Sequence, residues 1–232
     1  MPEISNLETL SPEEKRNLIA KLQSEMGGSN ASKPNRRTKS VTVLYLTEPE
    51  ITGLFRAIEE EGRRPGSRAD TNRERALFEL ALGRGLRASE VGLLELKHLR
   101  LKDSRLYVTR LKGGRTGEFL ITDREVRALK PYVKDRGWLP GPLFLSRNRR
   151  AISRRRLDEL MKFYGKGAGL PPQNRHFHCM RHTCATRLLD QGVKVEEVQD
   201  ILGHEDIRNT MIYAKITNAH RIEVGGRIRG SW

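Results

Sequence analysis

The stretch HCMRHTCATRLLDQGVKVEEVQDILGHEDIRNTMIY, residues 178–213, carries the clearest structural signal in the chain. Its apolar residues recur at helical spacing and are interrupted by Gly192 and Gly203, which predicts three short helices. The predicted core positions are Ala185, Leu188, Leu189, Val195, Val198, Ile201 and Leu202. Tyr213 lies among apolar residues at the end of the stretch, and such a tyrosine is usually a half-buried core residue. Taken alone, the stretch predicts a compact helical unit.

Composition limits the partners of the protein. The 232 residues include 44 Lys and Arg against 29 Asp and Glu, a net charge of +15, while 36% are hydrophobic. A folded domain with this charge is expected to bind a polyanion. No apolar run approaches the roughly 20 residues of a membrane span, and no signal peptide opens the chain. Cys179 and Cys184 lie too far apart on one predicted helix to bridge, so we expect reduced thiols in a cytoplasmic protein.

The first 40 residues differ in character from the rest. Ser11, Pro12 and Glu14 form a helix start, and an apolar stripe follows as far as Gly27. Residues 27–40, GGSNASKPNRRTKS, have the composition of a flexible basic linker. We therefore expect an N-terminal helix with a linker over residues 1–40 and a main domain over residues 41–232.

The main domain reads as mostly helical. Thr47 begins a capping box, helical periodicity continues through residues 76–82, and a break at glycines is followed by a restart with Ser89 as the cap. Residues 105–110 and 116–122 are short strand candidates around a glycine turn, which predicts a hairpin. Helical patterns then return. The expected fold is mainly α with a small antiparallel β-sheet, an α+β domain.

A later helix begins with a run of positive charge. Ser153 is a good cap, but Arg154, Arg155 and Arg156 follow at the positive end of the helix dipole, where cations are unfavourable. A phosphate backbone would relieve that conflict, so these arginines are candidate DNA contacts, together with Arg115 at the hairpin. The alternative is an exposed basic face without a ligand.

Separated motifs contain the groups needed to cut and rejoin a phosphodiester. The residues concerned are Arg87 in GLRASE, Lys112 at the hairpin tip, His178, Arg181, His204 and Tyr213. Guanidinium groups can hold the nonbridging oxygens of a phosphate, a phenol can become a covalent carrier, and lysine or histidine can move protons. A free tyrosine has a pKa of about 10, so attack requires a positive site that accepts its proton or favours phenolate.

In their order, GLRASE, LKGG, HCMRH, LGH and the final tyrosine resemble the signature of the tyrosine recombinase (phage integrase) family, over roughly residues 45–220. The resemblance implies the tyrosine recombinase catalytic-domain fold. It also implies a site-specific recombinase that cleaves and rejoins DNA through a 3′-phosphotyrosyl intermediate, without a metal, ATP or another cofactor. Integration, excision and inversion are all open. In length the chain is similar to the short fimbrial phase-switch recombinases.

The resemblance also implies roles for residues of this chain. Tyr213 would be the nucleophile, Arg87 and Arg181 would clamp the phosphate, and Lys112 would protonate the leaving oxygen. The two histidines expected to assist proton transfer are His178 and His204. Behind these groups, Glu90 and His182 would orient the site. The region before residue 45 predicts one helix and a linker instead of the separate DNA-clamping domain of classical members.

The partners that follow from the resemblance lie outside the chain. They are double-stranded DNA with paired recombination sites, other copies of the chain in a homotetramer on that DNA, and an accessory DNA-bending protein. The protein would then be associated with the nucleoid when bound to DNA. No membrane partner is expected.

Other readings of the same residues stay open. A non-catalytic DNA-binding regulator would use the basic helix and the glycine-punctuated helices, and a type IB topoisomerase would share the tyrosine and the positive clamp. A zinc site could use His178, His182, Cys179 and Cys184. Because the glutamate of an H-E-x-x-H motif is missing and Arg181 places a positive charge nearby, we predict no metal.

Overall fold

The computed structural model describes residues 43–67, 70–111 and 114–214. The predicted N-terminal helix and linker, and Lys112, lie outside these residues. The helices are α2 (Glu48–Arg63), α3 (Thr71–Arg84), α4 (Ala88–Val91), α5 (Asp123–Arg136), α6 (Arg154–Gly167), α7 (His178–Asp190) and α8 (Val195–Leu202), with short 3-10 turns at Leu96–His98 and Pro172–Asn174. The strands are β1 (Leu99–Arg100), β2 (Arg105–Val108) and β3 (Gly117–Leu120). The predicted mainly α fold with a small antiparallel sheet is confirmed.

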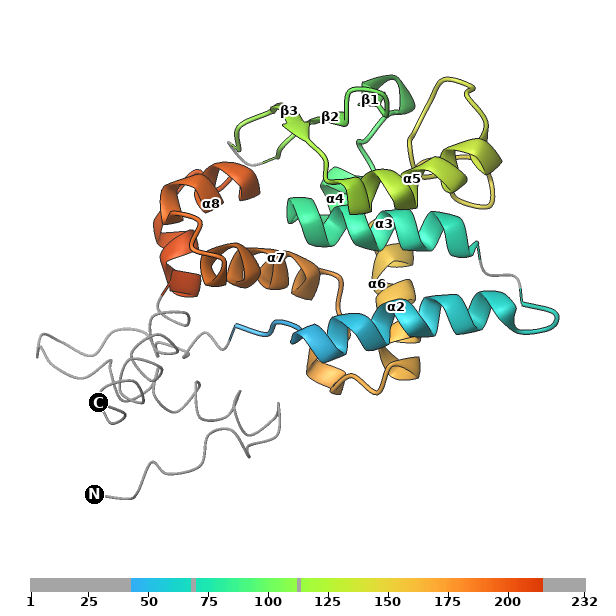
Figure 1. The fold of residues 1–232 in the computed structure, drawn as a ribbon, viewed down its shortest axis with the longest axis horizontal. Coiled ribbons are helices and arrows are strands. Elements are labelled where there is room, and N and C mark those ends of the chain that lie inside the picture. Colours follow the sequence, from blue (N-terminus) through green and yellow to red (C-terminus); the bar gives the residue numbers. More distant parts are fainter. Residues whose placement is uncertain (1–42, 68–69, 112–113, 215–232) are drawn as a thin grey trace, which may run out of the picture.

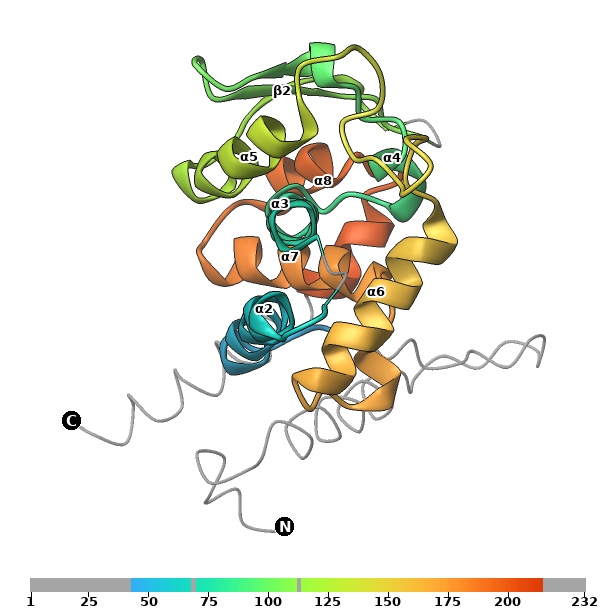
Figure 2. The same ribbon diagram turned by 90° about the vertical axis from the view of Figure 1, so that its right-hand side faces the viewer.

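Helix α3 runs through the middle of the domain, with α2, α5 and α7 packed around it (Figures 1 and 2). Its sequence is apolar on several faces, and Leu77, Phe78, Leu80 and Ala81 are fully buried. A helix that is apolar over much of its circumference is stable only when other elements cover it. This arrangement produces the larger of two hydrophobic clusters, which extends from α2 through α3 and α5 to α6.

The small sheet lies along one edge of the domain, at the top in Figure 1. Strands β2 and β3 pair antiparallel with Leu106 opposite Phe119, so the predicted hairpin is confirmed. Strand β1 pairs with β2 through Leu99 and Leu106 and was not predicted. Its two residues are too few to show an alternating pattern.

Helices α7 and α8 and the helical residues 208–214 confirm the three helices predicted for residues 178–213. Gly192 and Gly203 follow α7 and α8 with φ of 85° and 63°, the left-handed conformation that glycine adopts readily. The smaller hydrophobic cluster lies here, and its buried members are Val43, Cys184, Ala185, Leu189, Val198, Leu202, Tyr213 and Ala214. Cys179 and Cys184 are free and buried.

The helix starts were predicted with mixed success. Thr47 precedes α2 and its backbone N–H donates to the Glu50 carboxylate, and Ser153 caps α6 by accepting from Arg156. The predicted cap at Ser89 is wrong, because α4 begins at Ala88 with Arg87 as its N-cap residue. Among the described helices, none is both long and apolar enough to cross a membrane.

Candidate active site

Most of the predicted site residues converge between α4, α7 and the end of α8. Arg87 stands at the start of α4 and Arg181 lies in the first half of α7, while His204 follows α8 by two residues. Arg87 reaches this junction directly, since its Nη2 donates to the carbonyl of Gly203 at 3.4 Å. Tyr213 completes the group from the helical segment that closes the described chain.

Tyr213 faces a histidine inside the site. Its hydroxyl oxygen lies 2.7 Å from Nδ1 of His182, and the residue is only 4% exposed. The rings of Tyr213 and His204 are nearly parallel, with centroids 6.4 Å apart, and His178 contacts His182 edge-on at 4.6 Å. Tyr213 thus belongs both to the small hydrophobic cluster and to a cluster of imidazoles. The packing role and the chemical role are compatible.

Arg181 is a buried cation that makes no direct ion pair with a carboxylate of the described residues, although the charge of Glu90 acts on it from nearby. It is 1% exposed, and its Nη1 donates to the carbonyl of Gly85 at 2.7 Å. Within the described residues its Nη2 has no hydrogen-bond partner. Burial and the charge of Arg87 lower the pKa of Arg181 to about 10, so it stays protonated at neutral pH. A buried, charged donor left unpaired is costly, and an anion at this point would satisfy it.

Arg87 is held by Glu90, which is itself fully buried. The carboxylate accepts from Nη1 of Arg87 at 2.6 Å and from its backbone N–H at 2.9 Å. The second bond caps α4, which explains why the helix starts at Ala88 and not after Ser89. Glu90 therefore holds the guanidinium and the backbone of Arg87, and its role in orienting the site stays a prediction.

Arg110 was missed in the sequence analysis. Its side chain is fully buried and donates to Glu90 at 2.8 Å, and it follows β2 on the same inward face as Leu106 and Val108. Although burial of Glu90 favours its neutral form, the charge of Arg110 and the hydrogen bonds from Arg87 outweigh it and lower the carboxyl pKa. The signal was the alternation in RLYVTR, which places this arginine on the apolar side of the strand.

The electrostatics of the site keep its phenol and imidazoles neutral. Burial raises the pKa of Tyr213 to about 12, even though Arg181 and Arg87 oppose that shift. Burial, followed by nearby positive groups, lowers the pKa of His182 and of His204 to about 3. The pKa of His178 is also lowered, by partial burial and by Arg181. The imidazoles are therefore unprotonated at neutral pH, and their lowered pKa values make them weak proton acceptors in this state.

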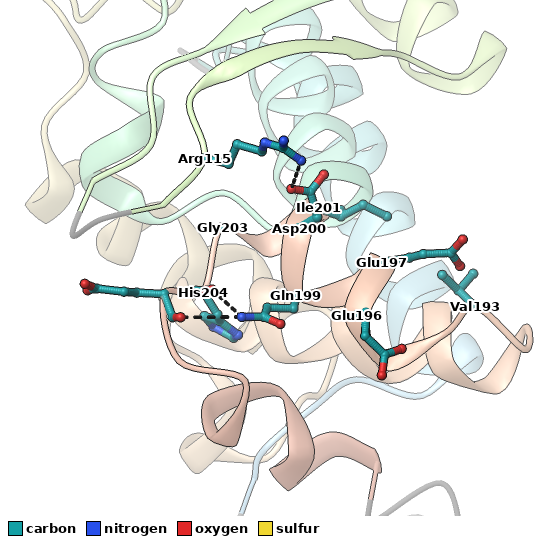
Figure 3. Close-up of a pocket in the computed structure, with 10 residues that line it drawn as sticks. Arg115, Val193, Glu196, Glu197, Gln199, Asp200, Ile201, Gly203 and His204 are labelled. Atoms are coloured by element: carbon teal, nitrogen blue, oxygen red, sulfur yellow. Dashed lines mark hydrogen bonds and ion pairs between the residues drawn. The ribbon is translucent and has the colours of Figure 1, made fainter.

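His204 is fixed by local contacts. Its Nδ1 lies 2.8 Å from the hydroxyl of Thr210, and its carbonyl accepts from Nε2 of Gln199 (Figure 3). It also lines a hollow of about 980 Å³ on the α8 side. The acidic residues lining that hollow are Glu196, Glu197, Asp200 and Glu205. Their negative charge would repel a phosphate, so the anion position suggested by Arg181 lies elsewhere.

The predicted DNA contacts do not belong to this convergent group. Arg155 and Arg156 share Glu159 one turn further along α6, at 2.9 and 3.4 Å, so part of the expected charge conflict is relieved within the helix. Arg154, in contrast, adds to the positive field around His178. Arg115 is 79% exposed and pairs with Asp200 at 3.2 Å (Figure 3).

The residues of the alternative zinc site do not converge. The thiol of Cys179 donates to the carbonyl of Leu44, and that of Cys184 points to the carbonyl of Gly83. Over the part of the chain that the structure describes, no group of three or more His, Cys, Asp or Glu side chains is placed to hold a metal ion.

Comparison with known proteins identifies the family. The model of the phage integrase family matches residues 45–220. The type 1 fimbriae regulatory protein FimB of Escherichia coli K12 is 33% identical over 192 residues, 81% of this chain and 88% of FimB. Tyrosine recombinase XerA of Pyrococcus horikoshii is 33% identical over 70% of this chain and 57% of its own. The structure of XerH recombinase bound to palindromic difH substrate has a TM-score of 0.70 at 17% identity, covering 98% of this chain and 75% of XerH.

The chain belongs to the phage integrase family. Its fold is that of a tyrosine recombinase catalytic domain, which confirms the prediction made from the motifs. The relatives named as tyrosine recombinases also support the predicted enzyme class. The similarity to short fimbrial proteins is confirmed by the match to FimB over most of its length.

Proposed function

We propose that this protein is a site-specific DNA recombinase in which Tyr213 attacks a phosphodiester held by Arg87 and Arg181. The observation that carries the proposal is the guanidinium of Arg181, which is buried and has an unpaired Nη2 in the described part of the chain. A phosphate bound there would receive charge-assisted hydrogen bonds from a rigid donor. The hydroxyl of Tyr213 belongs to the same electrostatic cluster, since Arg181 and Arg87 both act on its pKa.

The first step would form a bond between the Tyr213 oxygen and phosphorus and break the bond from phosphorus to the 5′ oxygen. His182 is the proposed acceptor of the phenolic proton, because its Nδ1 lies 2.7 Å from that hydroxyl. With the phenol pKa near 12 and the imidazole pKa near 3, the proton would not move before DNA binds. Transfer would accompany attack, as the phenolate charge passes to the phosphate.

The remaining predicted residues complete the proposal. Lys112 would give a proton to the departing 5′ oxygen, and His178 and His204 would hold charge that develops on the phosphate. A 5′ hydroxyl from a second duplex would then attack the phosphotyrosyl bond and release Tyr213. Because the bond energy is kept in the protein link, this sequence uses no ATP.

The assembly follows from the same chemistry. Exchange between two duplexes cuts every strand once, and each chain carries one Tyr213, so a homotetramer on paired sites is proposed. An accessory DNA-bending protein and association with the nucleoid belong to this proposal. Residues 41–232 would form the catalytic domain and residues 1–40 a separate appendage. The exposed Arg154, Arg155 and Arg115 and the partly exposed Arg156 would contact the DNA backbone.

Covalent trapping tests the proposal. A nicked duplex would carry a sequence selected by the protein from a randomised pool, so that loss of the short nicked fragment prevents rejoining. We expect a protein–DNA adduct on a denaturing gel without added metal, and no adduct from Tyr213→Phe. Tyr107→Phe is the matched control, because Tyr107 is exposed on β2, whereas the buried hydroxyl of Tyr164 donates to Glu74. Binding without any adduct would favour the non-catalytic regulator instead.

A further inference from the structure

Arg110 touches three segments that deliver site residues from distant parts of the chain. Through Nη1 it donates to Glu90, the carboxylate that holds Arg87. Through Nη2 it donates to the carbonyls of Arg84, at 2.9 Å, and Ile201. Its own backbone N–H donates to the hydroxyl of Thr116 at 2.9 Å, across the base of the β2–β3 turn.

The backbone at Gly114 and the residue after α8, Gly203, both lie against this side chain. A Cβ added to Gly114 would lie 2.7 Å from the carbonyl oxygen of Gly203 and 2.9 Å from Cβ of Arg110. A Cβ added to Gly203 would lie 3.1 Å from Cγ and Cδ of Arg110. The two glycines therefore allow a backbone approach that larger residues would prevent. His204 is the next residue, so its position depends on this contact.

Arg110 also affects how far Glu90 neutralises the positive charge of Arg87. The Glu90 carboxylate accepts from Arg87, from Arg110 and from the backbone N–H of Leu111. With Arg110 as a second cation, one carboxylate is shared between two guanidiniums, and the group keeps a net positive charge. Without Arg110, Glu90 would neutralise Arg87 in a buried site where such interactions are strong.

Stability alone does not account for a buried arginine at this position. Its Nε has no hydrogen-bond partner among the described residues, and its guanidinium lies 5.4 Å from the centroid of the Phe119 ring. Replacing a buried ion pair by apolar groups of similar volume is often neutral or stabilising. An apolar pair at positions 90 and 110 would fit the same core at lower cost, so the buried ion pair of Glu90 and Arg110 has another use.

We propose that Arg110 is a positioning residue of the strand-cleavage reaction: it joins Arg87, residues 114–116 and the His204 segment into one site and leaves the charge of Arg87 available for the phosphate. This inference rests on the proposed function of the same site. Arg110 itself does not touch the DNA in this account. Its effect reaches the phosphate through Glu90 and Arg87, and through Ile201 and His204.

The test compares Arg110→Met with Arg105→Met, because Arg105 is an exposed arginine on the strand just before Arg110 and pairs with Glu118. The measured quantities are the single-turnover rate of adduct formation at saturating nicked duplex, and the dissociation constant of the same duplex. We expect Arg110→Met to slow adduct formation by about 100-fold, since small misplacements of reacting groups cost about that much. The dissociation constant should change by less than about 3-fold, because phosphate contacts elsewhere dominate binding. Arg105→Met should match the wild type.

Two further variants keep the result interpretable. Arg110→Lys retains the charge near Glu90 but cannot reach both carbonyls, so an intermediate rate is expected. Glu90→Gln/Arg110→Met restores the net positive charge of the wild-type group without restoring the contact to Ile201, so it should fold, cleave faster than Arg110→Met and remain slower than wild type. Amide hydrogen exchange over residues 201–206 should be faster in Arg110→Met and in Glu90→Gln/Arg110→Met than in the wild type. It should be unchanged in Arg105→Met.

The outcomes separate this inference from the proposed function. No adduct from the wild type would refute the proposed function itself. A wild-type adduct with an unchanged rate in folded Arg110→Met would refute the positioning role. If Arg110→Met does not fold, the double variant decides: a rate equal to wild type would contradict the positioning of the His204 segment, and a slow rate with faster exchange would support it.

Discussion

The two hydrophobic clusters of the domain differ in size and in what they hold. The larger cluster surrounds α3 and fixes Glu90 through its neighbours Val91 and Leu94, while the smaller one contains Tyr213 itself, with Leu202 and Val198. Cooperative units with few buried apolar contacts open at lower free energy than large cores. The phosphate-clamping side of the site is therefore built on the more rigid part, and the nucleophile on the less stable part.

Three arginines make polar contacts between segments that belong to the two clusters. Arg110 reaches from β2 to the carbonyl of Ile201, and Arg87 reaches the carbonyl of Gly203. Arg181 lies on α7, the helix that contributes residues to both clusters, and donates to Gly85 before α4. Three arginines thus connect the halves of the site. Catalysis should be more sensitive to these side chains than stability is.

The largest expected effect is on Arg181. Arg181→Met should reduce the single-turnover rate of adduct formation by about 10³-fold, roughly 4 kcal/mol, because it removes a preorganised donor to the phosphate. The melting temperature should fall little, since the lost cation is buried and incompletely paired. Arg187→Met is the control, because Arg187 lies on the same helix and pairs with Glu48. Equal rates for the two variants would contradict the clamp.

The next prediction concerns the stability of the two clusters. Core substitutions test the packing of each cluster, and amide exchange compares the free energies at which they open. Leu202→Ala in the small cluster and Leu80→Ala in the large one both remove fully buried side chains, and each should cost about 2–5 kcal/mol of unfolding free energy. In the wild type, amide exchange of α8 should be faster than that of α3, as measured by mass spectrometry. Equal protection of the two helices would remove the contrast between the clusters.

A smaller effect concerns pH. The pKa values of His182 and His204, lowered to about 3 by burial and nearby positive groups, lie below the ordinary value of 6.5. Between these values the unfolded chain binds protons that the folded chain excludes. Stability is therefore fully present above about pH 6.5 and falls as the pH decreases toward 3. We expect a loss on the order of 1 kcal/mol per histidine by pH 5.

Denaturant titrations at pH 7 and pH 5 would measure this loss. His182→Gln/His204→Asn should make the dependence shallower, because two of the histidines with lowered pKa values are removed. The same slope in the double variant as in the wild type would show that other groups cause the acid sensitivity.

The smallest effect is expected on the basic helix α6. Arg155 is 89% exposed and pairs with Glu159, so Arg155→Gln should change the unfolding free energy by less than about 0.5 kcal/mol. If it contacts a phosphate, the slope of log binding constant against log salt should become shallower by about 1. An unchanged slope would assign Arg155 to the solvated surface. Glu159→Gln removes the carboxylate that pairs with Arg155 on the same helix, and it should not weaken DNA binding.

Much of this architecture could be predicted from short-range sequence patterns. The caps at Thr47 and Ser153, the hairpin and the glycines after α7 and α8 all depend on residues close together in sequence. Their physical causes are local, because caps, turns and apolar periodicity act over a few residues. The same holds for the spacing of His178 and Arg181 on one helix.

The rest depends on contacts between distant segments. Arg110 pairs with Glu90, and also meets Ile201, far along the chain; no local pattern encodes these partners. The cap at Ser89 was predicted from residue preference, but the buried Glu90 carboxylate moved the helix start to Ala88. His182 could not be separated from a structural histidine until its ring nitrogen was placed beside Tyr213.

The most direct measurement is the identity and polarity of the covalent link. The adduct from the nicked duplex would be digested with nuclease and protease, and the nucleotide-bearing peptide sequenced by mass spectrometry. We expect nucleotides attached through a 3′ phosphate to the peptide that contains Tyr213, with a free 5′ hydroxyl on the released strand. A link to another residue, or a 5′ phosphate attached to the protein, would contradict it.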